Sequence, residues 1–117
     1  MPHQEYQACM DACDDCADAC DYCLAACLKE QDVGMMAQCI ALDIDCAQLC
    51  RMSSSYMARG SEFAVAVCQM CADVCDSCAD ECGKHQADHC QECAKTCRRC
   101  SVECRRMCGM APPDRPV

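Results

Sequence analysis

The sequence is short of the residues that fill an ordinary protein core. It has no Trp, 1 Phe and 3 Tyr among its 117 residues. Cys accounts for 20 residues, so much of the nominal hydrophobic content of 53% is sulfur rather than Leu, Ile, Val or Phe. Such a Cys content marks an unusual scaffold. Whatever fills the interior must therefore involve thiol groups.

Basic residues and long apolar runs are also scarce. The chain has 10 Lys and Arg against 19 Asp and Glu, a net charge of −9. Because phosphate binding needs a basic surface, nucleic acid is not an expected partner. No apolar run approaches the roughly 18 residues of a membrane span, and the N-terminus lacks the pattern of a secretory signal. We expect a soluble, cytoplasmic protein in a reducing compartment, where many cysteines indicate metal rather than disulfides.

The cysteines recur in four segments, mostly at alternating intervals of three and four residues. This period of about 3.5 residues places the thiols in a stripe on one face of an α-helix. The second segment is sparser but keeps the same phase. In chain order the members are Cys9, Cys13, Cys16, Cys20, Cys23 and Cys27; Cys39, Cys46 and Cys50; Cys68, Cys71, Cys75, Cys78 and Cys82; and Cys90, Cys93, Cys97, Cys100, Cys104 and Cys108.

Residues typical of helix ends fall between the four stripes. Asp32 is expected to cap the second helix and Ser61 the third. Gly83 is expected to end the third helix as its C′ residue, and Gly109 to end the fourth.

Four helices joined by short loops predict an all-α fold, an antiparallel four-helix bundle with a cysteine-lined core. The sustained 3.5-residue period predicts coiled-coil-like packing. We expect residues 1–110 to form this single domain and residues 111–117 to be a flexible tail.

Several roles are open to such a set of thiols. Pure packing is disfavoured, because sulfur lining nearly every core position leaves voids that cost stability. Disulfides are disfavoured because neighbouring Cys on one helix face project roughly in parallel. Thiolates select Cu(I), zinc or iron–sulfur clusters. A zinc or iron–sulfur structural or redox module is therefore the alternative to copper.

Charge and coordination favour Cu(I) over zinc. Twenty thiolates carry a charge of about −20, which about 20 bridged Cu(I) ions would neutralise, whereas about five Zn²⁺ ions would leave half of it. A two-coordinate ion can bridge thiolates four residues apart on one helix. Tetrahedral zinc needs four convergent thiolates, which we expect a linear stripe to supply less easily. We therefore predict multiple Cu(I) ions per chain. No site differs from its repeats as a catalytic centre would, so we expect no enzyme.

The two ends of the bundle differ in composition. His85 and His89 lie in the loop at one end, where imidazole could form a copper entry site, although both could be ordinary loop residues. The opposite end gathers an expected apolar plug of methionines and one aromatic residue. The members of that plug are Met52, Met57, Met107, Met110 and Phe63. Asp43 falls in the phase of the second stripe, and either an inward oxygen ligand or an outward-facing residue is compatible with the sequence.

Apolar residues away from the cysteine stripes suggest self-association. Val33, Ile40 and Ile44 form a row on the second helix, and Val65 and Val67 begin the third. Such a patch on a small protein usually marks an interface. We therefore expect a homo-oligomer, although packing at the seams of the bundle is an alternative.

Two stretches resemble the bacterial four-helix-bundle copper storage proteins, specifically their cytosolic type. They are Cys78-Ala-Asp-Glu-Cys-Gly-Lys-His85 followed by His89-Cys90-Gln-Glu-Cys93-Ala-Lys-Thr-Cys97, and Cys39-Ile-Ala-Leu-Asp-Ile-Asp-Cys46-Ala-Gln-Leu-Cys50. The resemblance covers about residues 5 to 108. It implies Cu(I) storage with the cysteines as ligands, histidines near one mouth, and a homotetramer. A copper chaperone is a possible further partner.

Overall fold

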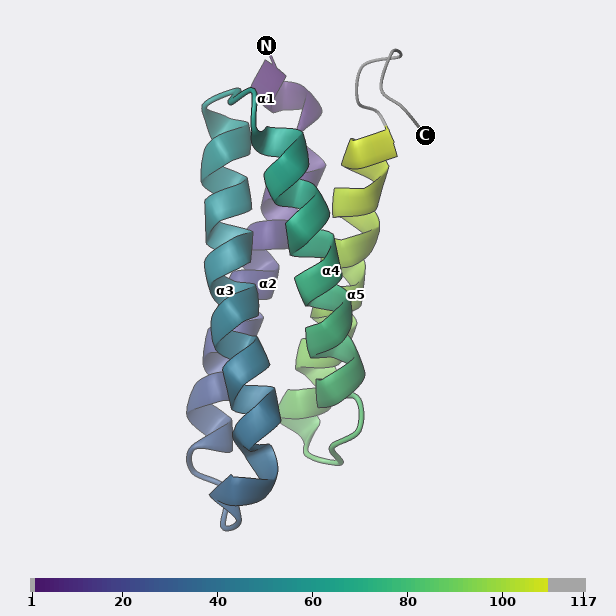
Figure 1. Ribbon diagram of the computed structural model, residues 1–117. Helices are drawn as coiled ribbons and strands as arrows, with labels where there is room; N and C mark the ends of the chain where they lie inside the picture. Colours follow the sequence, from purple (N-terminus) through teal and green to yellow (C-terminus); the bar gives the residue numbers. More distant parts are fainter. Residues whose placement is uncertain (1, 110–117) are drawn as a thin grey trace.

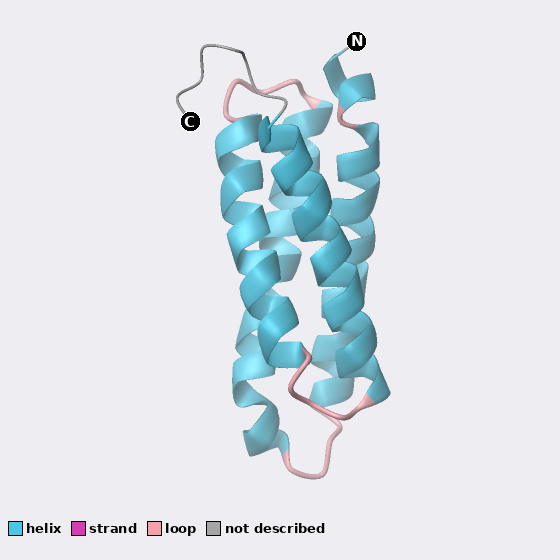
Figure 2. Cartoon of the chain, turned by 90° about the vertical axis from the view of Figure 1, so that its right-hand side faces the viewer, coloured by secondary structure: helices cyan, strands magenta, loops and turns pink. Residues whose placement is uncertain are grey.

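The computed structural model describes residues 2–109, which form an antiparallel four-helix bundle, as predicted. Each long helix packs against two neighbours, in the cyclic order α2, α3, α4, α5 (Figures 1 and 2). The elements are α1 (Pro2–Glu5), α2 (Gln7–Cys27), a 3₁₀ turn η1 (Val33–Met36), α3 (Ala37–Ala58), α4 (Ala64–Cys82) and α5 (Asp88–Gly109). The expected tail, residues 111–117, lies outside the described residues. The expected domain boundary at residue 110 stays a prediction.

Charged side chains on the outer faces join neighbouring helices. Arg51 of α3 contacts Asp21 of α2 at 2.6 Å, and Arg99 of α5 contacts Asp15 of α2 at 2.6 Å. These pairs are exposed to solvent, so each contributes at most about 1 kcal/mol. The charged face of each helix is therefore turned to solvent. The opposite face, which carries the thiols, is turned to the interior.

The expected N-caps are only partly correct. The Ser61 hydroxyl accepts a hydrogen bond from the Phe63 amide at 3.0 Å, which is the bond a capping side chain makes. The regular helix α4 begins at Ala64, so the N-cap position itself is Phe63. Asp32 does not cap α3: a 3₁₀ turn separates them, and the Asp32 side chain makes no capping bond to that turn.

Gly60, rather than Gly83, is the residue that needs glycine's conformational freedom. Gly60 has a φ of 64°. Its amide donates to Met57 O at 3.0 Å, and the next amide donates to Tyr56 O at 3.0 Å. This pair of bonds is the Schellman motif, which ends α3. Helix α4 ends directly before Gly83, as predicted, but Gly83 is its C-cap rather than its C′ residue and has a φ of −63° in right-handed conformation.

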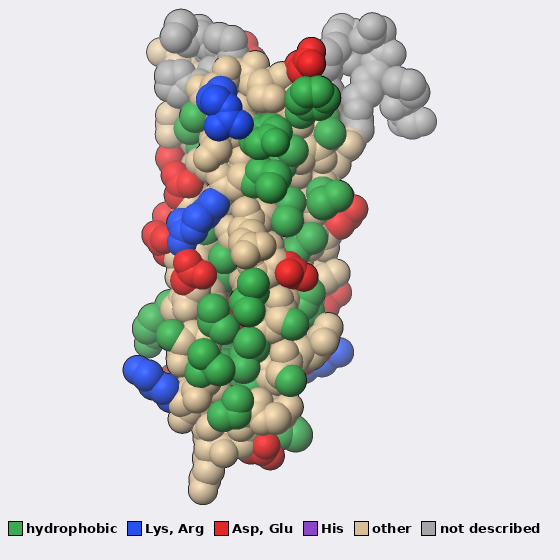
Figure 3. All heavy atoms as spheres, turned by 60° about the vertical axis from the view of Figure 1, so that its left-hand side comes forward, with side chains coloured by type: hydrophobic (Ala, Val, Ile, Leu, Met, Phe, Trp, Pro, Cys, Tyr) green, Lys and Arg blue, Asp and Glu red, His purple; other side chains and the backbone are tan. Residues whose placement is uncertain are grey.

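Helix α3 with the turn before it is unusually apolar. By length and composition Val33–Ala58 could cross a membrane, with a mean hydropathy of 1.3, and only 33% of its most apolar stretch is buried. This match rests on length and composition alone, and Gln38, Asp43 and Asp45 interrupt its apolar residues. In the bundle this helix packs between α2 and α4 and carries Cys39, Cys46 and Cys50 inward. Figure 3 shows a band of apolar side chains along the face where α3 comes forward.

Candidate metal-binding interior

All 20 cysteines are buried in the interior of the bundle, and none forms a disulfide within the described residues. Each stripe faces the shared axis because its 3.5-residue period keeps successive thiols on one side of a supercoiled helix. The interior therefore presents sulfur from all four long helices along its length.

The thiols at mid-height join the four helices through direct contacts. The Cys16 Sγ atom on α2 lies 3.7 Å from Cys46 Sγ on α3 and 3.6 Å from Cys97 Sγ on α5. Cys46 Sγ lies 3.5 Å from Cys75 Sγ on α4. A metal ion at this level can reach thiolates from any pair of helices.

Thiols four residues apart on one helix are also close together. The Sγ atoms of Cys23 and Cys27 are 3.8 Å apart, and those of Cys46 and Cys50 are 4.0 Å apart. The same spacing recurs on α4 and α5. The expected pairing of i and i+4 thiols on one helix is present, so an ion with two ligands can be held without closing a larger site.

Sets of four thiols also converge, contrary to our expectation. Within each set the four Sγ atoms lie within 4.8 Å of one another, and a tetrahedral ion with metal–sulfur distances of about 2.3 Å needs sulfurs about 3.8 Å apart. Neighbouring stripes converge on the axis, which a stripe considered alone does not reveal. The sets include Cys13, Cys71, Cys100 and Cys104; Cys16, Cys46, Cys50 and Cys75; Cys16, Cys20, Cys46 and Cys97; Cys20, Cys78, Cys93 and Cys97; and Cys23, Cys27, Cys39 and Cys90.

Several cysteines belong to more than one of these sets. Cys16 and Cys46 occur in two of them, as do Cys20 and Cys97. If every set holds a metal ion, the ions cannot each have four thiolates that no other ion shares. The arrangement suits ions that share bridging thiolates.

Burial favours the protonated form of Cys27 and Cys90, at the end where α2 meets α5. It raises the pKa of Cys90 to about 11, with the negative charge of Cys39 as the next cause. The pKa of Cys27 is raised as well, again chiefly by burial. These thiols carry protons at neutral pH, so binding a metal there releases protons.

Asp43 lies inside the thiol lining, which resolves the alternative that the sequence left open. Its side chain is fully buried. The Oδ1 atom lies 3.3 Å from both Cys78 Sγ and Cys93 Sγ, and Oδ2 lies 3.9 Å from Cys39 Sγ. Burial is the largest cause that raises the Asp43 pKa to about 10. Asp43 is therefore a neutral acid among the thiols of the empty bundle at pH 7.

The two predicted histidines differ in their relation to the thiols. His89 Nδ1 lies 3.5 Å from Cys23 Sγ, 3.5 Å from Cys90 Sγ and 3.9 Å from Cys27 Sγ. His85 Nε2 lies 2.9 Å from Glu81 Oε2. The structure thus brings His89 to the thiols, whereas His85 lines a pocket of about 370 Å³ between the two loops at this mouth.

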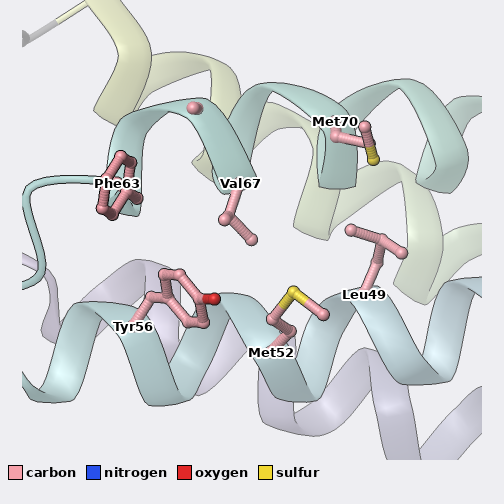
Figure 4. A pocket seen from close by; sticks show the side chains of 7 residues that line it. Leu49, Met52, Tyr56, Phe63, Val67 and Met70 are labelled. Atoms are coloured by element: carbon pink, nitrogen blue, oxygen red, sulfur yellow. The ribbon is translucent and has the colours of Figure 1, made fainter.

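The opposite end is closed by fewer residues than predicted. Met57 is fully buried and Met107 is 9% exposed. Met52 and Phe63 are 43% and 59% exposed, so they do not plug the interior. They line a surface groove of about 370 Å³ between α3 and α4 (Figure 4). Met110 lies outside the described residues.

Two residues of the interior and its mouth were missed by sequence reasoning. Ser53 is fully buried, and among the described residues its hydroxyl has no hydrogen-bond partner. Its spacing from Cys46 and Cys50 continues the stripe, which is a signal the sequence contained. Glu30 hydrogen-bonds to His89 at 2.8 Å. Nothing in the spacing of a loop carboxylate points to that contact.

Comparison with known proteins gives concordant matches. The family model described as copper storage protein matches residues 2–109. The uncharacterized cysteine-rich protein YhjQ of Bacillus subtilis (strain 168) is 44% identical over 86 residues, which are 74% of this chain and 80% of that protein.

Solved structures match over nearly the whole described chain. The Cu(I)-bound copper storage protein BsCsp3 is 44% identical, covers 88% of this chain and 97% of its own, and superposes with a TM-score of 0.85. A cytosolic copper storage protein from Streptomyces lividans, solved with five coppers, is 35% identical, covers 92% and 95%, and has a TM-score of 0.88.

Proposed function

The chain belongs to the copper storage protein family, and from that premise we propose that it stores copper in the cytosol as many Cu(I) ions held by the thiolates of all 20 cysteines. The observation that carries this proposal is the sharing of buried thiols between neighbouring sets of four. Bridged thiolates allow the number of ions to approach the number of cysteines, whereas one catalytic or structural ion would use one set.

Cu(I) suits this interior better than zinc does. Each Cu(I) ion replaces about one thiol proton when thiolates bridge, so the buried charge stays close to zero. Zinc with four thiolates leaves two negative charges per site in the buried interior. The overlap of the sets also prevents every set from holding its own Zn²⁺. No residue is assigned a catalytic role.

We place copper entry at the mouth formed by the ends of α2 and α4 and the start of α5. His89 faces three thiols there, and imidazole can hold Cu(I) without adding charge. His85, which faces Glu81, is assigned to the outer rim. A chaperone that delivers or retrieves copper would act at this mouth.

The groove between α3 and α4 supports assembly into a homotetramer. It is lined by apolar side chains from both helices, including Leu49, Met52, Phe63 and Met70. Val33 and Ile44, which belong to the predicted row on the second helix, are 37% and 40% exposed. Exposed apolar surface of this extent on a chain of 117 residues is typical of a subunit interface.

An anaerobic titration of fully reduced protein with Cu(I) tests the storage function. A chelator of known affinity competes for the metal, and the end point is read per chain. We expect many ions per chain, held against the chelator. An end point of one or two ions would contradict storage and favour a structural or redox site. A parallel titration with Zn²⁺ is expected to saturate at far fewer ions.

A further inference from the structure

The mouth contains two histidine–glutamate pairs, and one of them adjoins the thiols. His89 Nε2 lies 2.8 Å from Glu30 Oε2, and His85 Nε2 lies 2.9 Å from Glu81 Oε2. The other ring nitrogen of His89 faces Cys23 and Cys90 at 3.5 Å. His85 makes no hydrogen bond to a thiol among the described residues. The His89–Glu30 pair therefore adjoins the thiol lining, and the His85–Glu81 pair serves as its control.

We propose that Glu30 is a positioning residue for copper capture, which fixes His89 with the Nδ1 lone pair directed at the thiols of Cys23, Cys27 and Cys90. The proposal rests on the storage function and deepens it. The Glu30 carboxylate makes no hydrogen bond to a thiol among the described residues. Its role is to hold the imidazole of His89, which contacts three thiols.

The chemistry of the ring supports this assignment. Neutral imidazole carries one N–H and one lone pair, and an ionised carboxylate can only accept a hydrogen bond. Glu30 must therefore accept the Nε2–H, which leaves the Nδ1 lone pair facing the sulfurs. Carboxylates that accept the second N–H of a ligating histidine fix its tautomer and its orientation, and they raise its basicity as a ligand.

The position of Glu30 makes the contact a link across the mouth. The Glu30 amide donates to Cys27 O at 3.1 Å, so Glu30 is attached to the C-terminal turn of α2. His89 is the second residue of α5. The hydrogen bond holds the start of α5 against the α2 thiols. The His89 side chain is 13% exposed and the Glu30 side chain 39%, so the imidazole end of the bond is the more shielded from water.

The first test uses the reduced, copper-free protein. Nitrogen-15 NMR of the imidazole rings reports which nitrogen carries the proton. We expect His89 in the native chain to be the Nε2–H tautomer. Glu30→Ala should give a mixture of tautomers, whereas Glu30→Gln, whose amide oxygen can accept the same bond, should restore most of the native signal. The control Glu81→Ala should shift the signals of His85 and leave those of His89 unchanged.

The second test measures copper uptake from a Cu(I)–chelator complex by stopped flow. We expect Glu30→Ala to slow the first phase about tenfold, with the final capacity unchanged, because loss of the carboxylate behind a metal-binding histidine typically weakens metal binding by about that factor or more. Glu81→Ala should load at the native rate.

Two outcomes would overturn the positioning role: a native His89 tautomer in Glu30→Ala, or native loading kinetics in that variant. Failure of the native protein to take up many ions would instead reject the storage function. The NMR result would still decide whether Glu30 fixes the ring.

Discussion

The Cys93 thiol donates a hydrogen bond to Asp43 Oδ1 at 3.3 Å, which joins α5 to α3 through the middle of the sulfur-lined interior. Cys78 of α4 donates to the same oxygen at 3.3 Å. A single buried carboxyl group therefore connects three helices. Its protonation couples the stability of the metal-free bundle to pH.

Asp43→Asn is expected to stabilise the metal-free, reduced protein above neutral pH. The folded protein keeps the Asp43 proton up to a pKa of about 10, whereas the unfolded chain loses it near 3.9. The free energy of unfolding therefore falls as pH rises between these values, by up to about 1.4 kcal/mol per unit. Asn cannot ionise, so its curve should be flatter between pH 5 and 8.

Chemical denaturation at several pH values measures this effect. Asp45→Asn, at an exposed position on the same helix, is the matched control and should leave the slope unchanged. Parallel curves for the native chain and Asp43→Asn would contradict a protonated carboxyl at this site.

Two charges introduced into the groove between α3 and α4 are expected to dissociate the assembly. Phe63 and Met70 are each 59% exposed and line this groove, so Phe63→Lys with Met70→Lys places two cations in the proposed interface. Light scattering at micromolar concentration should show a monomer for this variant. Val102→Lys is the control, because Val102 is 60% exposed on α5 outside the groove. A monomeric native protein would reject the interface altogether.

Gly60→Ala is expected to lower the free energy of unfolding by about 1 kcal/mol, because a side chain at a φ of 64° is strained. Copper capacity should not change, since the Schellman motif lies outside the thiol lining. Gly34→Ala serves as the control: a Cβ atom there would meet its nearest atom, Asp32 Oδ1, at an ordinary 3.6 Å. Equal thermal stability of the two variants would show that the α3–α4 turn tolerates the change.

The architecture could be predicted because the cysteine intervals carry two kinds of information at once. A 3.5-residue period specifies a helix, and it also specifies which face of that helix is inward. The four stripes, the breaks between them and the end at which His85 and His89 lie all follow. The family resemblance of the segments around Cys39 and Cys78 agreed with the comparisons.

The cysteine intervals do not predict which way individual side chains point at the ends of the bundle and between the stripes. From the sequence alone, Asp43 could face either inward or outward. The structure shows it among thiols of α4 and α5. Met52 and Phe63 look like a plug from their position along the axis, yet they point to the outer groove. The contact between Glu30 and His89 joins residues 59 positions apart, which no local pattern reports.

Ser53 provides a test of the interior that does not depend on the mouth. Its hydroxyl is buried without a partner among the described residues, so removing it should help rather than harm the metal-free fold. Ser53→Ala is expected to raise the free energy of unfolding by about 1 kcal/mol. Ser101→Ala is the control and should lower it, because the Ser101 hydroxyl favours the charged form of Asp76 and so helps to lower the pKa of that carboxyl.

Ser53→Cys should then extend the copper lining itself. Ser53 follows Cys50 by three residues and precedes the buried Met57 by four, so a thiol there continues the α3 stripe toward the far end. Sulfur is larger than oxygen but needs no hydrogen bond, so the substitution exchanges a polar cost for a small packing cost. The Cu(I) titration should reach a higher end point than the native chain, by about one ion, because bridged thiolates bind close to one ion each. Ser101→Cys, at the seam between α4 and α5, should leave the end point unchanged. An equal end point for the native chain and Ser53→Cys would show that the cluster ends before this level.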